Sequence, residues 1–394
     1  MTKYFYILIL SFLIACSFDT KSGFWTQEKK LKQSAKETKK ISKLFSEKIL
    51  NEKEFNKNIK IKLTKNYLNR NKINGNNYGF SNIKLDFNKI SKYKFTKIKY
   101  FDQFDPEIVF YENNLIFFDN KGSIIRFSDN SKILWKKNFY NKKEKKINPV
   151  LNFSYQKNKL LVTDSLSKYY LVDITNGKLL WSKEHQSNFI SQIKIDDDRF
   201  YVLDSNNSFI CFSLSDGQEI WKFQTDKQLI KSQKKTSIIF DDKFVYFNNS
   251  KGEIVSLDKK YGNLAWITPT ITFDESFQSF LLKTSDLVMN QGSIYFSNSK
   301  NKFYSIDPQT GFINWTQDVN SDLRPIFVDN VIFTVSSSGY LYILDKNSGN
   351  IIRITDILGN FKLKKRKKIK LSGFVVGNEN IYISTGGGKL IVVS

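Results

Sequence analysis

Residues 172–181 read VDITNGKLLW, and this stretch decides the fold because it recurs along the chain. The close copies are residues 214–221 (LSDGQEIW), 257–266 (LDKKYGNLAW) and 306–315 (IDPQTGFINW). Two other copies are incomplete: one ends at Trp135 without the glycine, and residues 344–353 place Arg353 where the others have tryptophan. A repeated unit of this length indicates a fold built from stacked copies of one small structure.

Each copy has the same internal order. Alternating apolar and polar residues, as in residues 294–297 and 303–306, indicate period-two strands on either side of a polar turn. The aspartate of the Asp-x-x-x-Gly segment can bond to the backbone of the turn, and the glycine supplies a positive φ. The tryptophan then falls on the next strand, where a large ring can be buried between neighbouring sheets.

The spacing of the docking tryptophans predicts the fold class. They lie 40 to 49 residues apart and are Trp135, Trp181, Trp221, Trp266 and Trp315. Units of this size fit the four-stranded antiparallel blades of a β-propeller. We therefore expect an all-β propeller over residues 78–394, in which we count seven blades, with eight as the alternative.

The propeller must also close into a ring. The last copy, residues 381–394, contains two strands and then no outer strand. Residues 83–98 offer an extra strand, and Tyr93 lies 42 residues before Trp135, which is one repeat. We expect the N-terminal strand near residues 83–98 to complete the final blade as its outer strand.

The N-terminus indicates export and lipidation. Lys3 precedes an apolar run from Tyr4 to Ile14, which is too short to span a bilayer and has the length of a signal-peptide core. The run ends in LIAC, residues 13–16, which resembles a bacterial lipobox. Residues 1–15 are therefore expected to be a lipoprotein signal peptide, with Cys16 carrying the lipid, including palmitate. By resemblance to sorted lipoproteins, Ser17 favours the outer membrane. We therefore expect the protein to be lipid-anchored to the outer membrane and to face the periplasm.

Residues 16–77 are expected to be a tether. Apolar residues recur at helical spacing within residues 27–50, which predicts an amphipathic helix. Residues 51–77 are polar and have no clear period, which predicts a linker.

The formal charge of +24 comes almost entirely from lysine spread along the chain, as an AT-rich genome produces. An exported protein has little access to nucleic acid, so we predict no nucleic-acid partner. The densest basic run is residues 362–370, KLKKRKKIK. It is either a solvated loop or a contact for acidic lipid headgroups or for a partner.

Catalytic chemistry has few candidates in this sequence. The only cysteines are Cys16 and Cys211, and the only histidine is His185. One histidine without a nucleophile motif supports neither a triad nor a multi-histidine metal site. The run Asp196–Asp198 fits an ordinary turn between strands. We therefore predict no catalytic residue, no metal, no cofactor and no enzymatic activity.

The core at residues 173–181, Asp-x-x-x-Gly-Lys-x-x-Trp, resembles the WD40-like tryptophan-docking repeats of quinoprotein dehydrogenases. With the lipobox and the unfinished last blade, the chain is more similar to the outer-membrane β-barrel assembly lipoproteins of the BamB family. That resemblance implies a scaffold of the BAM complex in the assembly and insertion of outer-membrane proteins, with a BamA-type barrel protein as partner. It also implies eight blades, one more than we count.

The same resemblance places a partner-binding loop at Ile230, Lys231, Ser232 and Gln233. The family's Leu-x-Leu-Arg segment is matched there only at its first apolar position. Two alternatives remain open on the residues. One is a quinone-dependent dehydrogenase, which the missing vicinal cysteine pair opposes. The other is an envelope module that binds glycans through exposed aromatic side chains.

Overall fold

The computed structural model describes residues 54–56, 58–61, 76–78, 81–83, 91–96, 98, 108–225, 235–271, 282–377 and 379–394. The chain divides into Met1–Lys53 and Glu54–Ser394, and the described residues all belong to the second unit. The expected signal peptide, Cys16 and the helix expected within residues 27–50 lie outside the described residues. In the part that is described, no helix has the length and apolarity needed to cross a bilayer.

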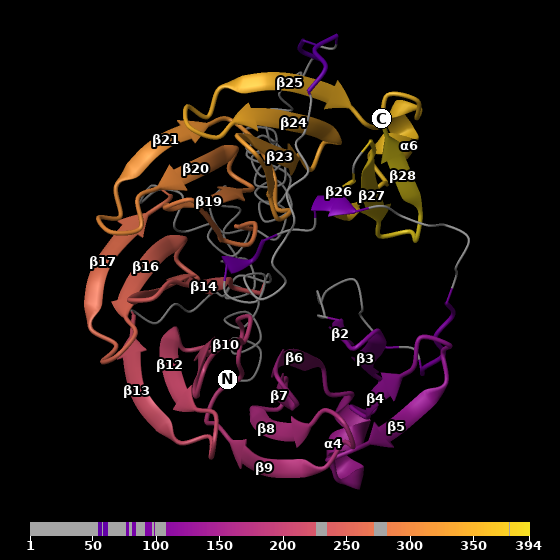
Figure 1. The fold of residues 1–394 in the computed structure, drawn as a ribbon, viewed down its shortest axis with the longest axis vertical. Coiled ribbons are helices and arrows are strands. Elements are labelled where there is room, and N and C mark those ends of the chain that lie inside the picture. Colours follow the sequence, from indigo (N-terminus) through magenta and orange to yellow (C-terminus); the bar gives the residue numbers. More distant parts are fainter. Residues whose placement is uncertain are drawn as a thin grey trace, which may run out of the picture. The chain divides into compact units, whose positions relative to one another are not determined.

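The described residues form seven four-stranded sheets, arranged as the blades of a propeller (Figure 1). Blades one to three are β2 (Val109–Tyr111), β3 (Asn114–Phe118), β4 (Ile124–Phe127), β5 (Ile133–Lys137); β6 (Leu151–Gln156), β7 (Lys159–Asp164), β8 (Lys168–Asp173), β9 (Leu179–Glu184); and β10 (Lys194–Asp196), β11 (Arg199–Leu203), β12 (Ser208–Ser213), β13 (Glu219–Gln224).

Blades four to six are β14 (Ile238–Phe240), β15 (Phe244–Asn248), β16 (Glu253–Asp258), β17 (Leu264–Pro269); β18 (Val288–Asn290), β19 (Ser293–Asn298), β20 (Lys302–Ile306), β21 (Ile313–Gln317); and β22 (Ile326–Val328), β23 (Val331–Val335), β24 (Tyr340–Asp345), β25 (Ile351–Asp356). Blade seven contains β1 (Ser81–Ile83), β26 (Leu371–Gly377), β27 (Ile381–Thr385) and β28 (Leu390–Val393). The expected all-β propeller with seven blades is confirmed, and the described residues form one blade fewer than the resemblance implies.

The core lies between neighbouring blades. The middle strands β7 and β12 are buried on both faces, because each sheet packs against the sheets before and after it. Between blades three and four, the rings of Phe209 and Phe247 stack with their centroids 4.2 Å apart. Burying one such side chain contributes about 1.5–3 kcal/mol. The abundance of aromatic residues therefore follows from the seams that they fill.

Blade seven is built differently from the expectation. β1 joins it at the inner edge, parallel to β26, and not outside β28 where an outer strand was expected. Residues 91–96 instead reach the third–fourth strand turn of blade one. There the Ser91 hydroxyl donates to the Asp129 carbonyl (3.0 Å), and the Tyr93 ring lies 5.4 Å from that of Phe127. Tyr93 thus packs on blade one, as each docking tryptophan packs on the blade that follows it.

The antiparallel order gives the propeller two unlike faces. We call the first the connection face: it carries the segments that link one blade to the next and the loops between second and third strands. The opposite turn face carries the remaining turns, including the Asp-x-x-x-Gly turns. Two short helices, α4 (Lys142–Ile147) and α6 (Leu363–Arg366), lie in blade-to-blade connections and therefore belong to the connection face.

Candidate functional site

The docking tryptophans hold neighbouring blades together. The indole Nε1 of Trp135, Trp181 and Trp221 donates to a carbonyl in the next blade's turn, each at 3.1 Å, and Trp266 does so at 2.9 Å. The turn glycine lies directly beneath the ring. At Gly262, with φ of +75°, an added Cβ would lie 2.5 Å from the ring of Trp221. Glycine is therefore required there by the backbone conformation and by the ring.

The aspartates of these turns serve the turns themselves. The Asp173 carboxylate accepts hydrogen bonds from the backbone amides of Thr175 (2.8 Å) and Asn176 (3.4 Å). The Thr175 side-chain hydrogen bond, followed by these amides, lowers the pKa of Asp173. Asp307 and Asp345 bond to their own turns in the same way. These carboxylates are occupied by local structure and are not placed for proton transfer.

The seam between blades six and seven departs from the repeat. Arg353 replaces the docking tryptophan, and its guanidinium donates to the Ile59 carbonyl and to the Thr355 hydroxyl, each at 3.1 Å. Beside it, the backbone of Phe55 forms a two-bond antiparallel bridge with Ile354 (3.2 and 3.0 Å). A segment from the region expected to be a linker thus pairs with the outer strand β25.

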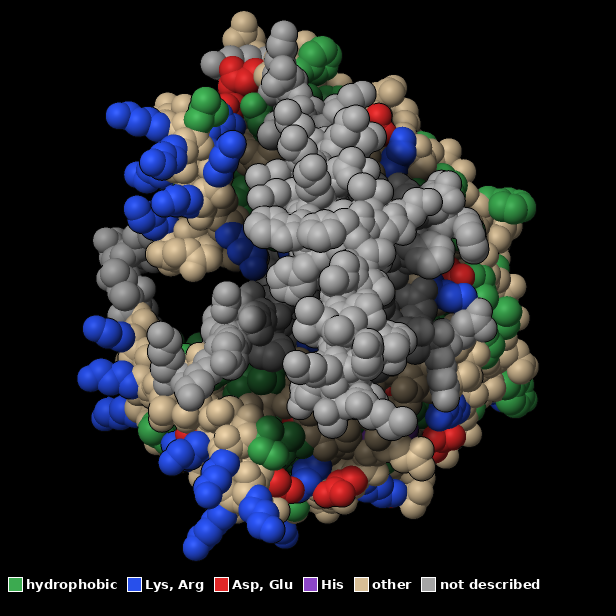
Figure 2. Space-filling model, turned by 180° about the vertical axis from the view of Figure 1, so that it is seen from behind, with side chains coloured by type: hydrophobic (Ala, Val, Ile, Leu, Met, Phe, Trp, Pro, Cys, Tyr) green, Lys and Arg blue, Asp and Glu red, His purple; other side chains and the backbone are tan. Residues whose placement is uncertain are grey.

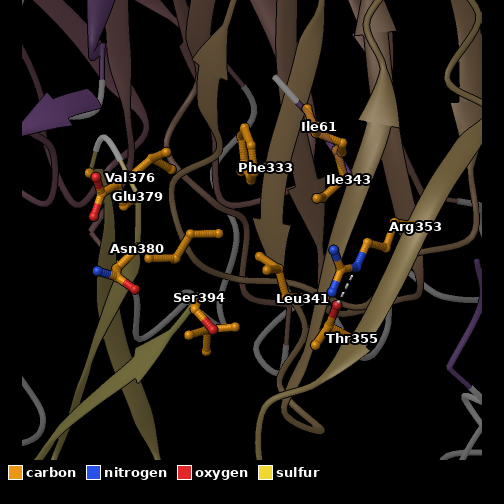
Figure 3. A pocket seen from close by; sticks show the side chains of 13 residues that line it. Ile61, Phe333, Leu341, Ile343, Arg353, Thr355, Val376, Glu379, Asn380 and Ser394 are labelled. Atoms are coloured by element: carbon orange, nitrogen blue, oxygen red, sulfur yellow. Dashed lines mark hydrogen bonds between the residues drawn. The ribbon is translucent and has the colours of Figure 1, made fainter. Parts of the chain in front are cut away.

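A small pocket of about 140 Å³ lies at this seam (Figure 3). Its walls are apolar and polar in about equal part: Ile61, Leu341 and Val376 line it together with the Arg353 guanidinium and the Glu379 carboxyl. Pockets for cofactors and drug-sized ligands occupy about 300–1,000 Å³. This pocket therefore accommodates a side chain or a very small molecule, but not a quinone-sized cofactor.

The inner ends of three blades are tied together by a residue from the N-terminal side. The Asn77 side-chain nitrogen, which has two N–H groups to donate, lies within hydrogen-bond distance of Gln192 (3.0 Å), Ser237 (3.0 Å) and the carbonyls of Ile238 (3.2 Å) and Leu287 (2.9 Å). The buried Lys194 ammonium donates to the Asn77 side-chain oxygen at 2.5 Å. Asn77 is 2% exposed and fills space toward the axis, where propellers can hold ligands.

The lone histidine belongs to a structural cluster. His185 Nε2 lies 3.2 Å from Asp204 Oδ2, which also accepts the Ser187 hydroxyl at 2.6 Å. Burial raises the pKa of Asp204, but hydrogen bonds from His185, Ser187 and the amides of Ser208 and Asn206 outweigh it and lower the pKa to about 2. Because serine and histidine both bond to the aspartate, the histidine is not placed to activate the serine as in a triad.

Nucleophile and metal chemistry are equally limited in the described part of the chain. Cys211 is buried, and burial raises the pKa of its thiol to about 12, so a reactive thiolate is disfavoured. Within the described residues, no three His, Cys, Asp or Glu side chains are grouped to hold a metal ion. In the Asp196–Asp198 run, Asp196 pairs with Lys259 at 2.5 Å.

The partner-binding residues expected from the sequence, Ile230 to Gln233, lie outside the described residues. The flanking strands are β13 and β14, so the link between them is one of the blade-to-blade connections. Sequence reasoning missed Asn77, whose direct hydrogen-bond partners are 115 to 210 residues away along the chain. No local pattern marks such a residue.

Comparison with solved structures supports the fold. The structure of BamB from Moraxella catarrhalis matches with a TM-score of 0.51 and 15% identity, covering 74% of this chain and 96% of that one. A europium-containing methanol dehydrogenase matches with a TM-score of 0.55 and 12% identity, covering 71% of this chain and 72% of that one. At these identities the likeness concerns the fold alone. No curated protein matches the sequence.

The sequence of the blades themselves carries a family signature. The profile of the family described as outer membrane protein assembly factor BamB matches residues 120–355, from blade one to the outer strand of blade six. This range contains the five docking tryptophans and most of the Asp-x-x-x-Gly turns. The chain therefore belongs to the BamB family of outer membrane protein assembly factors.

Proposed function

We propose that this protein is a non-catalytic scaffold in the assembly and insertion of outer-membrane β-barrel proteins. The observation that carries the proposal is the family match over residues 120–355. In this proposal residues 1–15 are a signal peptide, Cys16 carries the lipid, and residues 16–77 tether the propeller to the periplasmic side of the outer membrane. A BamA-type barrel protein is the proposed partner.

The interior of the propeller supports a binding role over a catalytic one. Asn77 and its partners from three blades occupy space at the inner ends of the sheets. The pocket between blades six and seven, of about 140 Å³, is small for an organic cofactor. A scaffold needs neither an open axis nor a reactive centre, because it works through its surface loops.

We place partner binding on the blade-to-blade connections. Ile230, Lys231, Ser232 and Gln233 follow β13 and precede β14, so they belong to that set by their position in the chain. Four-residue replacement of this segment by Gly-Ser-Gly-Ser is expected to weaken partner binding without unfolding the blades. A matched control replaces Lys178 and Lys260, which are exposed in third–fourth strand turns on the opposite turn face.

The decisive experiment is co-purification from native envelopes. The tagged full chain, extracted in mild detergent, is expected to recover a barrel-assembly component in stoichiometric amount. Recovery of none, from envelopes in which the barrel component itself is detected, contradicts the proposal. The same preparation labelled with palmitate tests Cys16 separately, so failure of the anchor and failure of the scaffold role give different results.

The second candidate is a quinone-dependent dehydrogenase, favoured by the structural likeness to a methanol dehydrogenase. Two features weigh against it: the chain has no vicinal cysteine pair, and Cys211 is buried. Reconstitution with pyrroloquinoline quinone and a calcium or lanthanide ion tests it directly. Cofactor absorbance that stays with the protein through gel filtration, together with alcohol oxidation, would favour the enzyme over the scaffold.

A further inference from the structure

The two faces of the propeller differ in charge. On the turn face, each third–fourth strand turn of blades one to six carries an aspartate: Asp129, Asp173, Asp216, Asp258, Asp307 and Asp345. On the connection face, Asp119, Asp164 and Asp204 are at most 2% exposed and bond to the amides of their own loops. These three carboxylates therefore contribute little to the surface that a partner meets, and the exposed Glu184 and Asp318 at this face pair with Lys168 and Lys302.

The connection face carries two lysine-rich helices. α4 holds four lysines at Lys142, Lys143, Lys145 and Lys146, and the segment around α6 holds six between Lys362 and Lys370. Among the described residues, Lys362, Lys364, Lys367 and Lys368 are exposed and make no ion pair. Figure 2 shows Lys and Arg side chains gathered along the side of the propeller that carries blades seven, one and two.

Each helix is fixed to the propeller by its one charged residue that is not a lysine. In α4, Glu144 closes a capping box with Asn141 and pairs with Lys168 of β8 at 2.5 Å. In the α6 segment the single arginine, Arg366, makes two hydrogen bonds with Asp356 of β25, at 2.8 and 2.9 Å. The anchoring pairs are thus internal, and Lys142, Lys143, Lys146, Lys362, Lys364, Lys367 and Lys368 are exposed.

Each helix also exposes one large apolar side chain. Leu363, the first residue of α6, is 75% exposed, and Ile147, the last residue of α4, is 63% exposed. Single exposed apolar side chains occur elsewhere on this surface, as at Phe312, but Leu363 and Ile147 each belong to a helix that also exposes several lysines. The same combination, basic residues around an apolar one, is how interfacial segments bind anionic bilayers.

We propose that the connection face lies against an anionic phospholipid surface, with the α4 and α6 lysines on the headgroup phosphates and Leu363 and Ile147 entering the acyl boundary. The two helices lie in different blade-to-blade connections, with blades seven and one between them. A single partner that contacts both helices must therefore present an extended surface. Lysine suits a diffuse array of phosphates, whereas arginine suits fixed bidentate partners, and here the arginine is already paired. The inference goes beyond the scaffold role and does not need the lipid at Cys16.

Vesicle co-sedimentation of the full chain carrying Cys16→Ser, which cannot be acylated at that position, tests the proposal. Vesicles of phosphatidylcholine are compared with vesicles in which about a third of the lipid is phosphatidylglycerol, in about 0.1 M salt. Binding to the neutral vesicles measures whatever the apolar N-terminal run contributes. The expected result is binding that favours the anionic vesicles at least about tenfold and weakens as salt increases.

Charge-matched variants locate the effect. Replacing Lys364, Lys365, Lys367 and Lys368 with glutamine is expected to weaken anionic-vesicle binding by more than about a hundredfold, since each of the four lysines near such a surface contributes roughly a factor of five. Replacing Lys142, Lys143 and Lys146 is expected to act in the same direction. The control removes four exposed lysines of the turn face, Lys132, Lys157, Lys178 and Lys260, and is expected to stay within about twofold of the parent.

Three results would overturn the proposal. The first is that the turn-face control loses as much vesicle binding as the α6 variant does, which would mean that net charge alone drives binding. The second is no preference for anionic vesicles. The third is an α6 variant that keeps vesicle binding but loses the barrel-assembly component, which would make this face a protein-binding surface. Loss of vesicle binding with retained co-purification supports the proposal and leaves the scaffold role intact.

Discussion

At the residue scale, the repeat is a contact between one glycine and one indole. Gly262 has φ of +75° beneath Trp221, whereas Gly292 has φ of +79° and an added Cβ there would meet no heavy atom within 4 Å. The two glycines therefore share a backbone conformation and differ in what surrounds them. Their comparison separates conformational strain from crowding of the ring.

Alanine at Gly292 is expected to cost about 1–2 kcal/mol in the free energy of unfolding, which is the strain of a left-handed residue. Alanine at Gly262 is expected to cost at least about 2 kcal/mol more, because its Cβ would lie 2.5 Å from the ring of Trp221. Urea unfolding of both variants measures the difference. Equal costs would mean that the indole contact adds nothing to the requirement for glycine.

The Asp204 cluster predicts a pH dependence. Its pKa of about 2 in the folded protein lies below the ordinary value of 3.8, so ionised Asp204 contributes stability above about pH 4. That contribution, about 2 kcal/mol, is lost as the pH falls from about 4 to 2. Asp204→Asn is expected to flatten the unfolding free energy over this window, whereas Asp242→Asn, at an exposed turn, should leave the profile close to that of the parent. An unchanged profile in Asp204→Asn would refute the assignment.

At the scale of elements, the N-terminal segments are used as structural parts of the propeller. Phe55 pairs with β25, Asn77 joins blades three to five, β1 extends β26, and residues 91–96 pack on blade one. Each contact lies where a blade lacks part of the repeat or where the inner ends of the sheets come together. A region that is polar and without period can therefore still be ordered by partners elsewhere in the chain.

Asn77→Ala is expected to lower the free energy of unfolding by about 2–4 kcal/mol, because it removes several buried hydrogen bonds at once. Asn56→Ala, which removes an exposed bond to the Ile352 carbonyl, is expected to cost less than about 1 kcal/mol. Chemical unfolding followed by tryptophan fluorescence reports both. Similar costs for the two variants would show that Asn77 is not a structural hub.

At the scale of the whole molecule, family membership and charge distribution address different questions. The family match supports a partner in barrel assembly, whereas the lysines of α4 and α6 support an orientation of the propeller against a lipid surface. Both can hold together, because a scaffold beside a membrane-embedded partner meets protein and lipid at once. The envelope and vesicle experiments distinguish them.

Lipid anchoring through Cys16 is also predicted for the whole molecule. Cells grown with labelled palmitate are expected to incorporate label into the parent chain and none into Cys16→Ala. Cys211→Ala serves as the control, because that thiol is buried in blade three and should not affect labelling. Label retained in Cys16→Ala would contradict lipidation at this position.

The sequence by itself determined the propeller and its seven blades, because the Asp-x-x-x-Gly turn and the following tryptophan are local chemistry repeated at a regular interval. Only the tertiary structure decided that β1 joins blade seven at the inner edge, that Asn77 bonds across three blades, and that α4 and α6 share one face. These depend on contacts between residues far apart in the chain. Residues that pair at a sheet edge, or that meet in distant loops, show no repeating pattern in the sequence. Such contacts therefore cannot be predicted from the pattern of residues alone.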